Sequence, residues 1–594
     1  MIFGKHINHY YLRYLHVLLL GLAALIGVDY LQLFIPNLYQ MVINGMNTGI
    51  VVKNGAEHVF DMTFLVSRIC MPMAGIIVCV VFGRFLWRIC FFGTGLRVET
   101  DLRNRMFDHA RNLSREYYQV NKVGNLMSLF TNDLDAIQES VSWGILEMCD
   151  ALFLGIMAFS KMWRMDAILT GFTLIPMGCL MACSIIIGRQ LTRKWDARQK
   201  AFSDLSDFSQ ESFSGIAVIK AFVKEAKELL AFQKLNKENE ETNVAFTKAS
   251  TLFRILTMML VESVICVILG YGGYLVYCGR FNAGQLVEFI GYFSSTVWPV
   301  MAVSDLIDLT SQGQASLKRV SEMLDAPVTV KDRPGVSPLP RVHGEIEFRD
   351  LSFRYPDGEF DSLNHVSFTI QAGENIGLVG KTGCGKTTLV DLILRTYNVP
   401  DGTLFIDGHD VNDVAIRDIR AGCAYVPQDN FLFSDTIANN ISFGVDEKPE
   451  ESILQAAEMA DIDSNIREFT HGYDTVLGER GVTVSGGQKQ RISIARALMK
   501  DAPILILDDS VSAVDTKTER NILGNLRTAR AGKTTILIAH RISTIEQMDK
   551  VLFMDDGTVA AFGTHQELYD SNQDYRKMVD LQKLEEEGGE DHNV

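Results

Sequence analysis

Gly380-Lys381-Thr382-Gly383-Cys384-Gly385-Lys386-Thr387 is the stretch of this 594-residue sequence that decides its fold. It matches the pattern G-x-x-x-x-G-K-[ST], in which a glycine-rich loop opens a helix. The backbone N–H groups of such a loop cradle phosphates at the helix N-terminus. We expect Lys386 to reach the β- and γ-phosphates and Thr387 to hold Mg²⁺ through its hydroxyl, with Thr388 beside it. The segment therefore predicts ATP and Mg²⁺ as cofactors.

The rest of the sequence falls into two halves of different composition. Hydrophobic residues make up 47% of the chain against 22% charged residues, and the long apolar runs lie before residue 310. Each run has about 18 to 26 residues, enough for a helix to cross a hydrocarbon layer of about 30 Å. A buried soluble helix is the alternative for any single run, but six together predict a membrane domain. The runs are 15–35, 70–92, 141–162, 168–187, 252–277 and 286–303.

Charge in the loops predicts how these spans are oriented. The stretches 97–122 and 189–254 are rich in Lys and Arg, whereas Lys53 is the one such residue in 44–61. Because basic loops stay on the cytoplasmic side, we expect both long stretches and both termini in the cytoplasm. Their helix formers and spaced apolar residues also predict that the membrane helices extend beyond the bilayer. The first run continues past Pro36 without a small-residue cleavage site, so we interpret it as a retained span.

From about residue 341 the pattern changes to alternating strands and helices. Such alternation predicts an α/β domain with a mostly parallel sheet. The net charge of −16 argues against nucleic acid as a partner. We divide the chain into a transmembrane domain (1–325), a proline-rich linker (326–340), the α/β domain (341–583) and an acidic, disordered tail (584–594).

Four further residues of the α/β domain are predicted to meet at the nucleotide. Asp508 ends an apolar strand, where a P-loop ATPase places a carboxylate that organises Mg²⁺. Tyr355 precedes the loop and can stack on adenine, and Gln428 can contact Mg²⁺ or the attacking water. His540 follows another apolar strand and can touch the γ-phosphate. The alternatives are a capped buried strand, an edge-strand tyrosine, a solvent-facing glutamine and a structural histidine.

Ser485-Gly486-Gly487-Gln488 precedes a predicted helix, 489–499, and offers N–H groups to an anion. Alone it would be an ordinary glycine-rich turn. Together with the preceding features it makes the domain resemble the nucleotide-binding domain of an ATP-binding cassette (ABC) transporter. In that family the glycine-rich loop is called Walker A and this turn the signature. The likeness continues in 478–481 and 512–515, and the first half resembles the six-helix exporter domain.

This resemblance implies a half-transporter that works as a dimer in the lipid bilayer. Two ATP molecules would lie between Walker A of one chain and the signature of the other, and hydrolysis would drive export of amphiphilic drugs, lipids or peptides. Asp509, Gln428 and His540 would serve hydrolysis. We place the two coupling helices, which carry motion between the domains, at 115–122 and 211–215.

Asp509 is a departure from the family, which carries Glu there as the general base. A side chain shorter by one methylene places the carboxylate about 1.5 Å further from the attacking water. Such a misplacement can cost around 10²-fold in rate. Because the signature is intact, the chain resembles the degenerate-site subunit of bacterial heterodimeric multidrug exporters, and we expect a non-identical partner carrying Glu. A homodimeric exporter in which Asp509 works as base, an ATP-gated regulatory protein and an importer stay open.

Two smaller hypotheses concern buried polar groups. Charged residues within membrane spans usually face a cavity. We therefore expect Asp29, Glu262 and Asp305 to line a pathway for cationic amphiphiles, with interhelical salt bridges as the alternative. Cys384 lies among loop N–H groups that favour a reactive thiolate, which predicts that thiol reagents block ATP binding.

Overall fold

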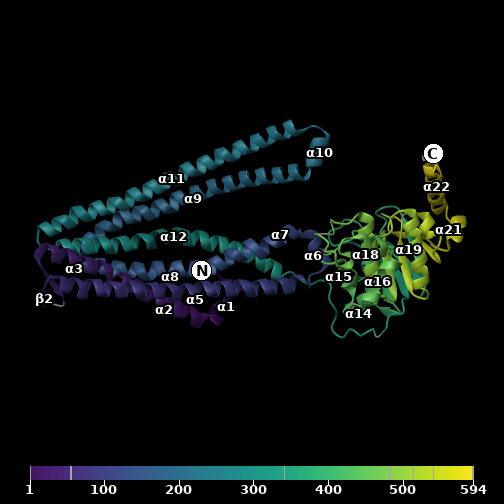
Figure 1. Cartoon of the computed structure of the whole chain (residues 1–594), viewed down its shortest axis with the longest axis horizontal. Coiled ribbons are helices and arrows are strands. Elements are labelled where there is room, and N and C mark those ends of the chain that lie inside the picture. The colour runs from purple at the N-terminus through teal and green to yellow at the C-terminus, as the bar shows by residue number, and fades with distance from the viewer. Residues whose placement is uncertain are drawn as a thin grey trace. The chain divides into compact units, whose positions relative to one another are not determined.

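The computed structural model describes residues 2–53, 56–339, 341–447, 449–478, 481, 483–512, 514–539 and 541–590. It divides into two compact units, shown in Figure 1. The first comprises Met1–Arg111 and Val123–Ala326, and the second comprises Asn112–Lys122 and Pro327–Val594. The short segment Asn112–Lys122 therefore packs with the second unit, although both of its chain neighbours belong to the first.

Long helices build the first unit. The longest, α11, has 53 residues and spans about 80 Å at 1.5 Å per residue, far more than a bilayer core. A helix of this length agrees with the expected extension beyond the bilayer, which stays a prediction. The helices are α1 (Asn8–Arg13), α2 (Leu15–Gln32), α3 (Ile35–Thr48), α4 (Met62–Phe64), α5 (Met71–Ala110), α7 (Val123–Ser128), α8 (Leu134–Met165), α9 (Ala167–Ser214), α10 (Ile216–Ala221), α11 (Glu225–Tyr277) and α12 (Ala283–Leu324), with π-helical turns η1 (Leu65–Cys70) and η2 (Leu129–Asp133).

Five helical stretches among the described residues are long and apolar enough to span a membrane. The predicted run 168–187 lies in α9, whose apolar part among those residues is Ala167–Cys179. The sixth span therefore stays a prediction, although α9 is one continuous helix. The five stretches are Leu15–Thr48, Met62–Ala110, Val123–Met165, Glu225–Tyr277 and Ala283–Leu324.

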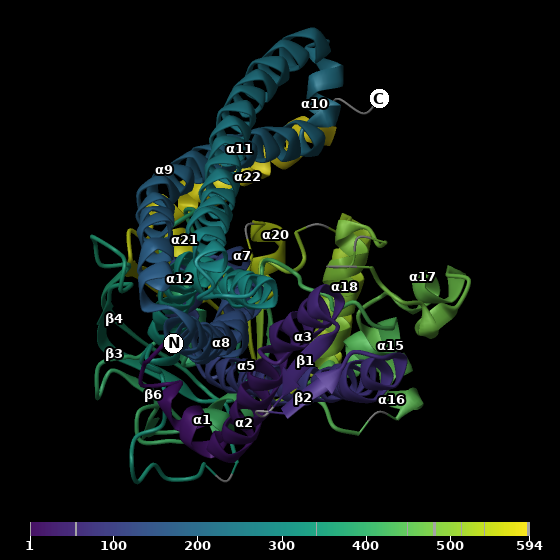
Figure 2. The same cartoon turned by 90° about the vertical axis from the view of Figure 1, so that its left-hand side faces the viewer.

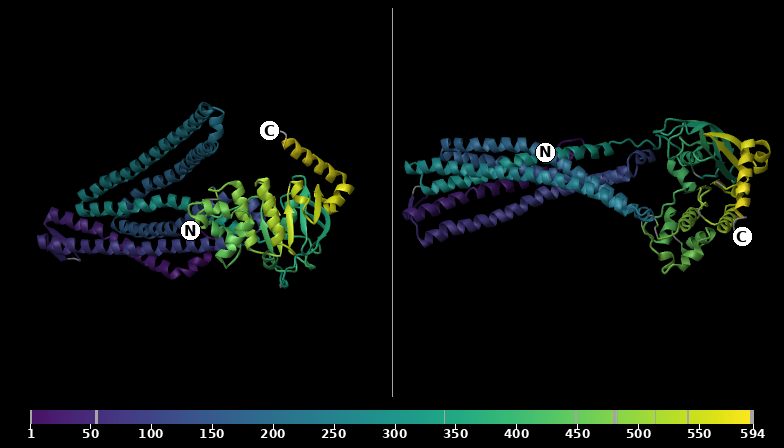
Figure 3. Two further views of the ribbon diagram at one scale, coloured as in Figure 1. Left: turned by 45° about the vertical axis from the view of Figure 1, so that its right-hand side comes forward. Right: turned by 90° about the horizontal axis from the view of Figure 1, so that it is seen from above.

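α9 and α11 lie side by side as one long hairpin (Figure 2), joined through α10. Figure 1 and the left panel of Figure 3 show this pair diverging from α8 and α12 toward the α10 end. The predicted position of the second coupling helix, 211–215, is wrong, because those residues end α9. Gly215 ends that helix with an N–H donated to Glu211 O at 2.8 Å, and the short helix begins only after it.

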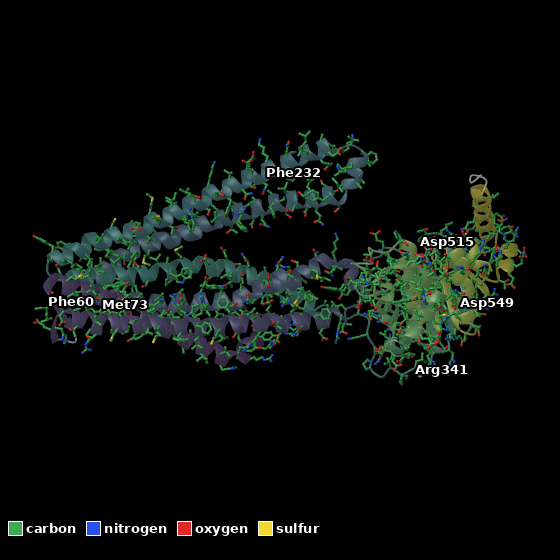
Figure 4. All side chains as sticks on the ribbon, viewed as in Figure 1. Phe60, Met73, Phe232, Arg341, Asp515 and Asp549 are labelled. Carbon is green, nitrogen blue, oxygen red and sulfur yellow. The ribbon has the colours of Figure 1, made fainter. Side chains whose placement is uncertain are left out.

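Small residues let the remaining helices approach closely. A Cβ at Gly21 of α2 would lie 2.8 Å from Cys90 Cβ, and one at Gly83 of α5 would lie 2.5 Å from Val28 Cγ2, so α2 and α5 pack almost backbone to backbone. At one end of the unit Phe60 and Met73 (Figure 4) share a small apolar cluster beside the hairpin β1 (Ile50–Lys53)–β2 (Ala56–Val59).

The second unit contains two sheets. The larger has the order β12-β11-β5-β10-β9-β8 and is parallel except for β12, which confirms the predicted mostly parallel sheet. The smaller, β4-β3-β6-β7, is antiparallel and was not expected. The strands are β3 (Ile346–Phe353), β4 (Leu363–Ile370), β5 (Asn375–Gly380), β6 (Leu404–Ile406), β7 (His409–Asp410), β8 (Cys423–Val426), β9 (Ile504–Asp508), β10 (Thr534–Ile538), β11 (Lys550–Asp555) and β12 (Thr558–Gly563).

Helices of the second unit cover both sheets. The last, α22, runs to Glu590, so a helix continues into the segment predicted to be a disordered tail; its glutamates are good helix formers. The helices are α6 (Arg115–Val120), α13 (Lys386–Ile393), α14 (Ile416–Ala421), α15 (Ile437–Ile441), α16 (Glu450–Met459), α17 (Asp463–Glu468), α18 (Gly486–Met499), α19 (Thr516–Ala529), α20 (Ile542–Ile545), α21 (His565–Ser571) and α22 (Gln573–Glu590), with 3₁₀ turns η3 (Ser442–Gly444) and η4 (Gly472–Asp474).

Candidate functional site

A cavity of about 300 Å³ lies where the parallel strands β5, β9 and β10 end. This is the edge of a parallel sheet where ligands bind in α/β proteins. The cavity brings together most of the residues that the sequence predicted for the nucleotide. It is lined by Tyr355, Ser362, Thr382, Gly383, Gly385, Lys386, Thr387, Thr388, Gln428, Asp508, Asp509 and Ile538.

Backbone carbonyl groups of the glycine-rich loop accept hydrogen bonds from the loop's own lysine. Lys386 Nζ donates to Gly380 O and to Lys381 O, both at 2.8 Å, and its side chain is buried. Gly385 has a φ of 97°, and a Cβ there would lie 2.8 Å from Ser362 O, so the position requires glycine. The helix α13 begins at Lys386, which gives the loop a helix N-terminus for phosphate.

Cys384 is less accessible than the sequence suggested. Its side chain is buried, and its Sγ accepts from Lys386 Nζ at 3.7 Å. A Cβ at Gly380 would lie 2.7 Å from that sulfur, so the thiol points into the loop. Because reagents reach exposed thiols most readily, this burial should slow labelling, and the block of ATP binding by thiol reagents stays a prediction.

Tyr355 lies at the rim of the cavity and is tied to the phosphate helix. Its hydroxyl and that of Thr388 on α13 are hydrogen-bonded at 2.9 Å. The rings of Phe353 and Tyr397 pack edge-on against it, each with a centroid distance of 5.1 Å. These contacts hold the ring of Tyr355 in one orientation beside the cavity.

Asp508 presents a buried carboxylate to the same cavity. Its side chain is 2% exposed, and among the described residues Oδ2 has no hydrogen-bond partner. Burial raises the pKa of Asp508, while a hydrogen bond from Thr387 opposes that shift and the charge of Asp509 adds to it. An unsatisfied carboxylate oxygen beside a threonine hydroxyl suits Mg²⁺, which takes few protein ligands and completes its shell with water and phosphate. No cluster of three or more His, Cys, Asp or Glu able to hold a metal occurs within the described ranges.

Asp509 follows in a left-handed conformation, with a φ of 47°. Aspartate is one of the few non-glycine residues enriched there. Its N–H donates to Ile538 O at 3.0 Å, and its carbonyl accepts from Gln490 Nε2 at 3.2 Å and from Ser512 Oγ at 3.0 Å. The backbone that carries this carboxylate is thus held on both sides.

The signature turn caps α18, which begins at Gly486 and not at the predicted Lys489. Ser485 Oγ accepts from Gln488 N at 3.3 Å, and Gln488 Oε1 accepts from Ser485 N at 2.9 Å. This reciprocal capping box starts the helix three residues earlier than its apolar pattern indicates. Ser485 and Gly486 are exposed, and no residue of the turn is among those lining the cavity.

The remaining predicted site residues have mixed outcomes. Gly380 and Lys381 belong to the loop without lining the cavity. His540 lies outside the described residues, as do Glu479 and Arg480 of the segment 478–481. Asp515 (Figure 4) caps α19, where its carboxylate accepts from the backbone N–H groups of Lys517 and Thr518.

Sequence reasoning missed an ion pair between a half-exposed arginine and a buried carboxylate. Arg115 Nη1 of α6 donates to Asp391 Oδ1 of α13 at 2.6 Å, and the Asp391 side chain is buried. Burial raises the pKa of Asp391, and the Arg115 guanidinium opposes that shift. An acid inside the apolar helix 389–393 was the available signal. The predicted first coupling helix, 115–122, contains α6, and it belongs to the compact unit of the nucleotide domain.

Asp29, Glu262 and Asp305, the three acids predicted to line one pathway, do not share a cavity among the described residues. Asp29 lines a second cavity, of about 410 Å³, together with Asp150. Glu262 is exposed on α11, and neither it nor Asp305 lines that cavity among the described residues. The expectation of one pathway shared by these three acids is therefore not met within the chain.

Long apolar helices followed by a P-loop α/β domain define a membrane-bound ATPase. The family described as ABC transporter transmembrane region matches residues 18–300, and that described as ABC transporter matches residues 363–512. The chain belongs to the ABC transporter family, and within it to the exporters.

Its relatives match over nearly their whole length. The chain is 35% identical over 593 residues to the probable multidrug resistance ABC transporter ATP-binding/permease protein YheI of Bacillus subtilis, covering 99% of this chain and 98% of the relative. It is 34% identical to the ATP-dependent lipid A-core flippase of Syntrophus aciditrophicus, covering 88% and 87%. A solved bacterial Atm1-family ABC exporter with ATP bound superposes with a TM-score of 0.75 at 25% identity, covering 97% and 99%.

This membership fixes the general activity. The protein is a multi-pass membrane exporter that binds ATP and couples its hydrolysis to transport. Exporters of this kind work as dimers on amphiphilic substrates, with the nucleotide-binding domain in the cytoplasm.

Proposed function

We propose that this chain is the half of a heterodimeric ABC exporter that contributes the slow, degenerate ATP site. Its partner would be a non-identical half-transporter with Glu at the position of Asp509 and an altered signature. The cargo would be an amphiphilic small molecule of the drug, lipid or peptide class. Relatives whose names describe multidrug resistance and lipid A-core flipping support that class.

Within the site, the proposed roles follow the geometry of the cavity. Tyr355 stacks on adenine, and the loop from Gly380 to Thr388 binds the phosphates with Lys386. Thr387, Gln428 and Asp508 hold Mg²⁺, which supplies charge neutralisation to the phosphates when bound. Asp509 orients the attacking water, and His540 contacts the γ-phosphate. The proposal also sets the domain limits: the transmembrane domain is 1–325, the linker 326–340, the nucleotide-binding domain 341–583 and the tail 584–594.

The hydrogen bonds around Asp509 carry the argument for a slow site. A shorter side chain can serve as base only if its backbone moves toward the water by about the length of one methylene, about 1.5 Å. Such a move would break the bond to Ile538 O or those from Gln490 and Ser512. Since the backbone is held on both sides, the aspartate stays short of the position that a glutamate would reach.

The signature turn supports the other half of the proposal. Its capping box is complete, and Ser485 and Gly486 are exposed without lining the chain's own cavity, so they are available to another chain. A turn with satisfied internal bonds presents its free N–H groups at a fixed helix N-terminus. This chain would therefore donate a competent signature while its own Walker motifs turn over slowly.

Nucleotide trapping tests this proposal. The chain is co-purified with the half-transporter encoded beside it, incubated with a photoreactive ATP analogue under turnover, and irradiated. We expect unhydrolysed triphosphate on this chain and diphosphate on the partner, and Asp509→Glu should convert the label on this chain to diphosphate. Diphosphate on wild-type chains of a homodimer would instead favour the homodimeric exporter.

A further inference from the structure

The second cavity lies inside the membrane-spanning part of the first unit. It is bounded by α2, α5, α8 and α12, all within the apolar stretches described above. Its volume of about 410 Å³ is in the range of small-molecule sites. Charged and aromatic side chains gather on its wall, namely Asp29, Arg84, Trp87, Arg88, Trp143, Asp150 and Trp298.

Asp29 and Asp150 form a carboxyl pair on this wall. Their side chains share a hydrogen bond, and Asp150 Oδ2 also accepts from Trp298 Nε1 at 3.0 Å. A carboxylate has no proton to donate, so a bond between two carboxyls requires a proton on one of them. Two carboxyls so close disfavour double ionisation, so one proton held between them is the state on which the inference rests.

Two arginines of α5, Arg84 and Arg88, line the cavity beside the pair. Arg84 of α5 faces both carboxyls and offsets the remaining negative charge. Arg88 of the same helix lies 5.4 Å from the centre of the Trp87 ring. On the other side, Glu147 of α8 faces Asp150 and Asp305 of α12.

Two buried groups at this cavity lack the partners that buried polar atoms normally have. Asp29 is 2% exposed, and apart from the Asp150 carboxyl no described group reaches its Oδ2. Trp87 is 8% exposed, and its Nε1 has no acceptor among the described residues. Unsatisfied buried groups are destabilising unless a ligand or water completes them. Both groups line the same cavity; the open acceptor of Asp29 fits a cationic ligand head, whereas the open donor of Trp87 fits water.

We propose that this cavity binds the cationic head of an amphiphile in exchange for the proton shared by Asp29 and Asp150. The carboxyl O–H bond breaks, the proton passes to water, and the ligand cation takes its place between two carboxylates. The net charge of the site is then the same before and after binding. Exchange is favoured over simple addition because uncompensated charge is strongly disfavoured within a bilayer. The indole rings of Trp143 and Trp298 add cation–π attraction.

This inference rests on the proposed export function and adds to it a charge class and a proton stoichiometry. It predicts that cation binding strengthens as pH rises, because the proton competes with the cation. The limit is tenfold in affinity for each pH unit when one proton is exchanged. A ligand of equal size and opposite charge should not be accepted.

Calorimetry on the full-length protein in lipid nanodiscs tests the exchange. Tetraphenylphosphonium is titrated without nucleotide in two buffers of different ionisation enthalpy, with empty nanodiscs subtracted. We expect about one proton released for each bound cation. Tetraphenylborate, which has nearly the same shape and the opposite charge, should show no binding above that of empty nanodiscs, no proton release and no competition with the cation. Cation binding with no proton release, or equal competition by the anion, would overturn the proposal.

Substitutions of Asp29 and Asp150, with a matched control, test whether the released proton comes from this carboxyl pair. Asp29→Asn and Asp150→Asn should each abolish proton release and weaken binding of the cation by roughly tenfold or more. Asp135→Asn, on the exposed part of α8, is the control and should behave as wild type. If an Asn variant does not fold, Trp298→Phe keeps both acids and should weaken binding while retaining proton release. Unchanged binding in all three pair variants would contradict the assignment.

ATP binding and ATPase activity are measured on the same preparations. Absence of cation–proton exchange in the wild-type protein with normal ATPase would refute this inference alone. Normal exchange in a protein without transport would instead refute the proposed export function.

Discussion

Arg115 Nη1 of α6 donates a hydrogen bond to Oδ1 of the buried Asp391 carboxylate on α13, at a distance of 2.6 Å. α13 begins at Lys386 of the phosphate loop, and Thr388 on the same helix is bonded to Tyr355. The chain continues from α6 directly into α5 on one side and α7 on the other. A change at the nucleotide can therefore reach the transmembrane helices through one ion pair and a covalent connection.

Arg115→Ala should uncouple ATP hydrolysis from its stimulation by the transported substrate. It leaves the Asp391 carboxylate buried without its cation, and one-sided loss of a buried pair is more damaging than removal of both charges. We expect substrate-stimulated ATPase to fall roughly tenfold while basal ATPase changes little. The double variant Arg115→Ala/Asp391→Asn should recover much of the loss. A double variant as poor as the single one would mean that the pair does not transmit the signal.

Tyr355→Ala should weaken ATP binding through loss of base stacking. Stacking of one base on an aromatic ring contributes about 1–3 kcal/mol, or roughly 5- to 150-fold in affinity. Tyr355→Phe keeps the ring and loses only the bond to Thr388, so it should stay within a few-fold of wild type. Titration with a fluorescent ATP analogue measures both variants, and equal losses in the two would contradict a stacking role.

Asp508 should make stability depend on pH and on Mg²⁺. Because burial raises its pKa in the folded protein, its contribution to stability is present at low pH and is lost as pH rises through that raised pKa. Mg²⁺ with ATP should compensate the charge of the ionised, buried carboxylate, so the gain in melting temperature on adding them should grow as pH rises through the raised pKa of Asp508. Asp508→Asn should raise the melting temperature of the nucleotide-free protein and remove the Mg²⁺-dependent gain. A pH-independent gain in wild type would count against Asp508 as a metal ligand.

Ser485→Arg should impair the partner's site. In the co-purified pair we expect roughly a 10²-fold loss of ATPase, because the bulky cation disrupts N–H groups that act at the faster site. Lys386→Ala, which disables this chain's own phosphate loop, should cost only a few-fold. The reverse order of the two effects would place the competent Walker motifs on this chain.

Local patterns were enough to predict much of the nucleotide domain. Apolar strands ending at Asp508 and before His540, with the loop at Gly380, placed the parallel sheet and the cavity at its edge, because parallel strands align their carboxyl ends. The exporter fold followed from the motifs together with the apolar runs. The start of α18 was missed because its capping box lies in polar residues before the apolar period begins.

Contacts between distant residues were beyond such reasoning. Arg115 and Asp391 come from separate elements, and no sequence pattern near either residue predicts their contact. The same holds for Asp29 and Asp150, which meet only through the packing of α2 against α8. The antiparallel sheet was missed because the strands β6 and β7, of three and two residues, are too short to show a period.

ATPase rate, measured on the chain alone and co-purified with the half-transporter encoded beside it, tests the degenerate site most directly. Each preparation is made with Asp509 and with Asp509→Glu. We predict a slow chain alone, a pair faster by around 10²-fold, and less than about a twofold gain from Asp509→Glu in the pair. A chain that alone forms a stable dimer, hydrolyses ATP as fast as the pair and gains nothing from Asp509→Glu would contradict the account.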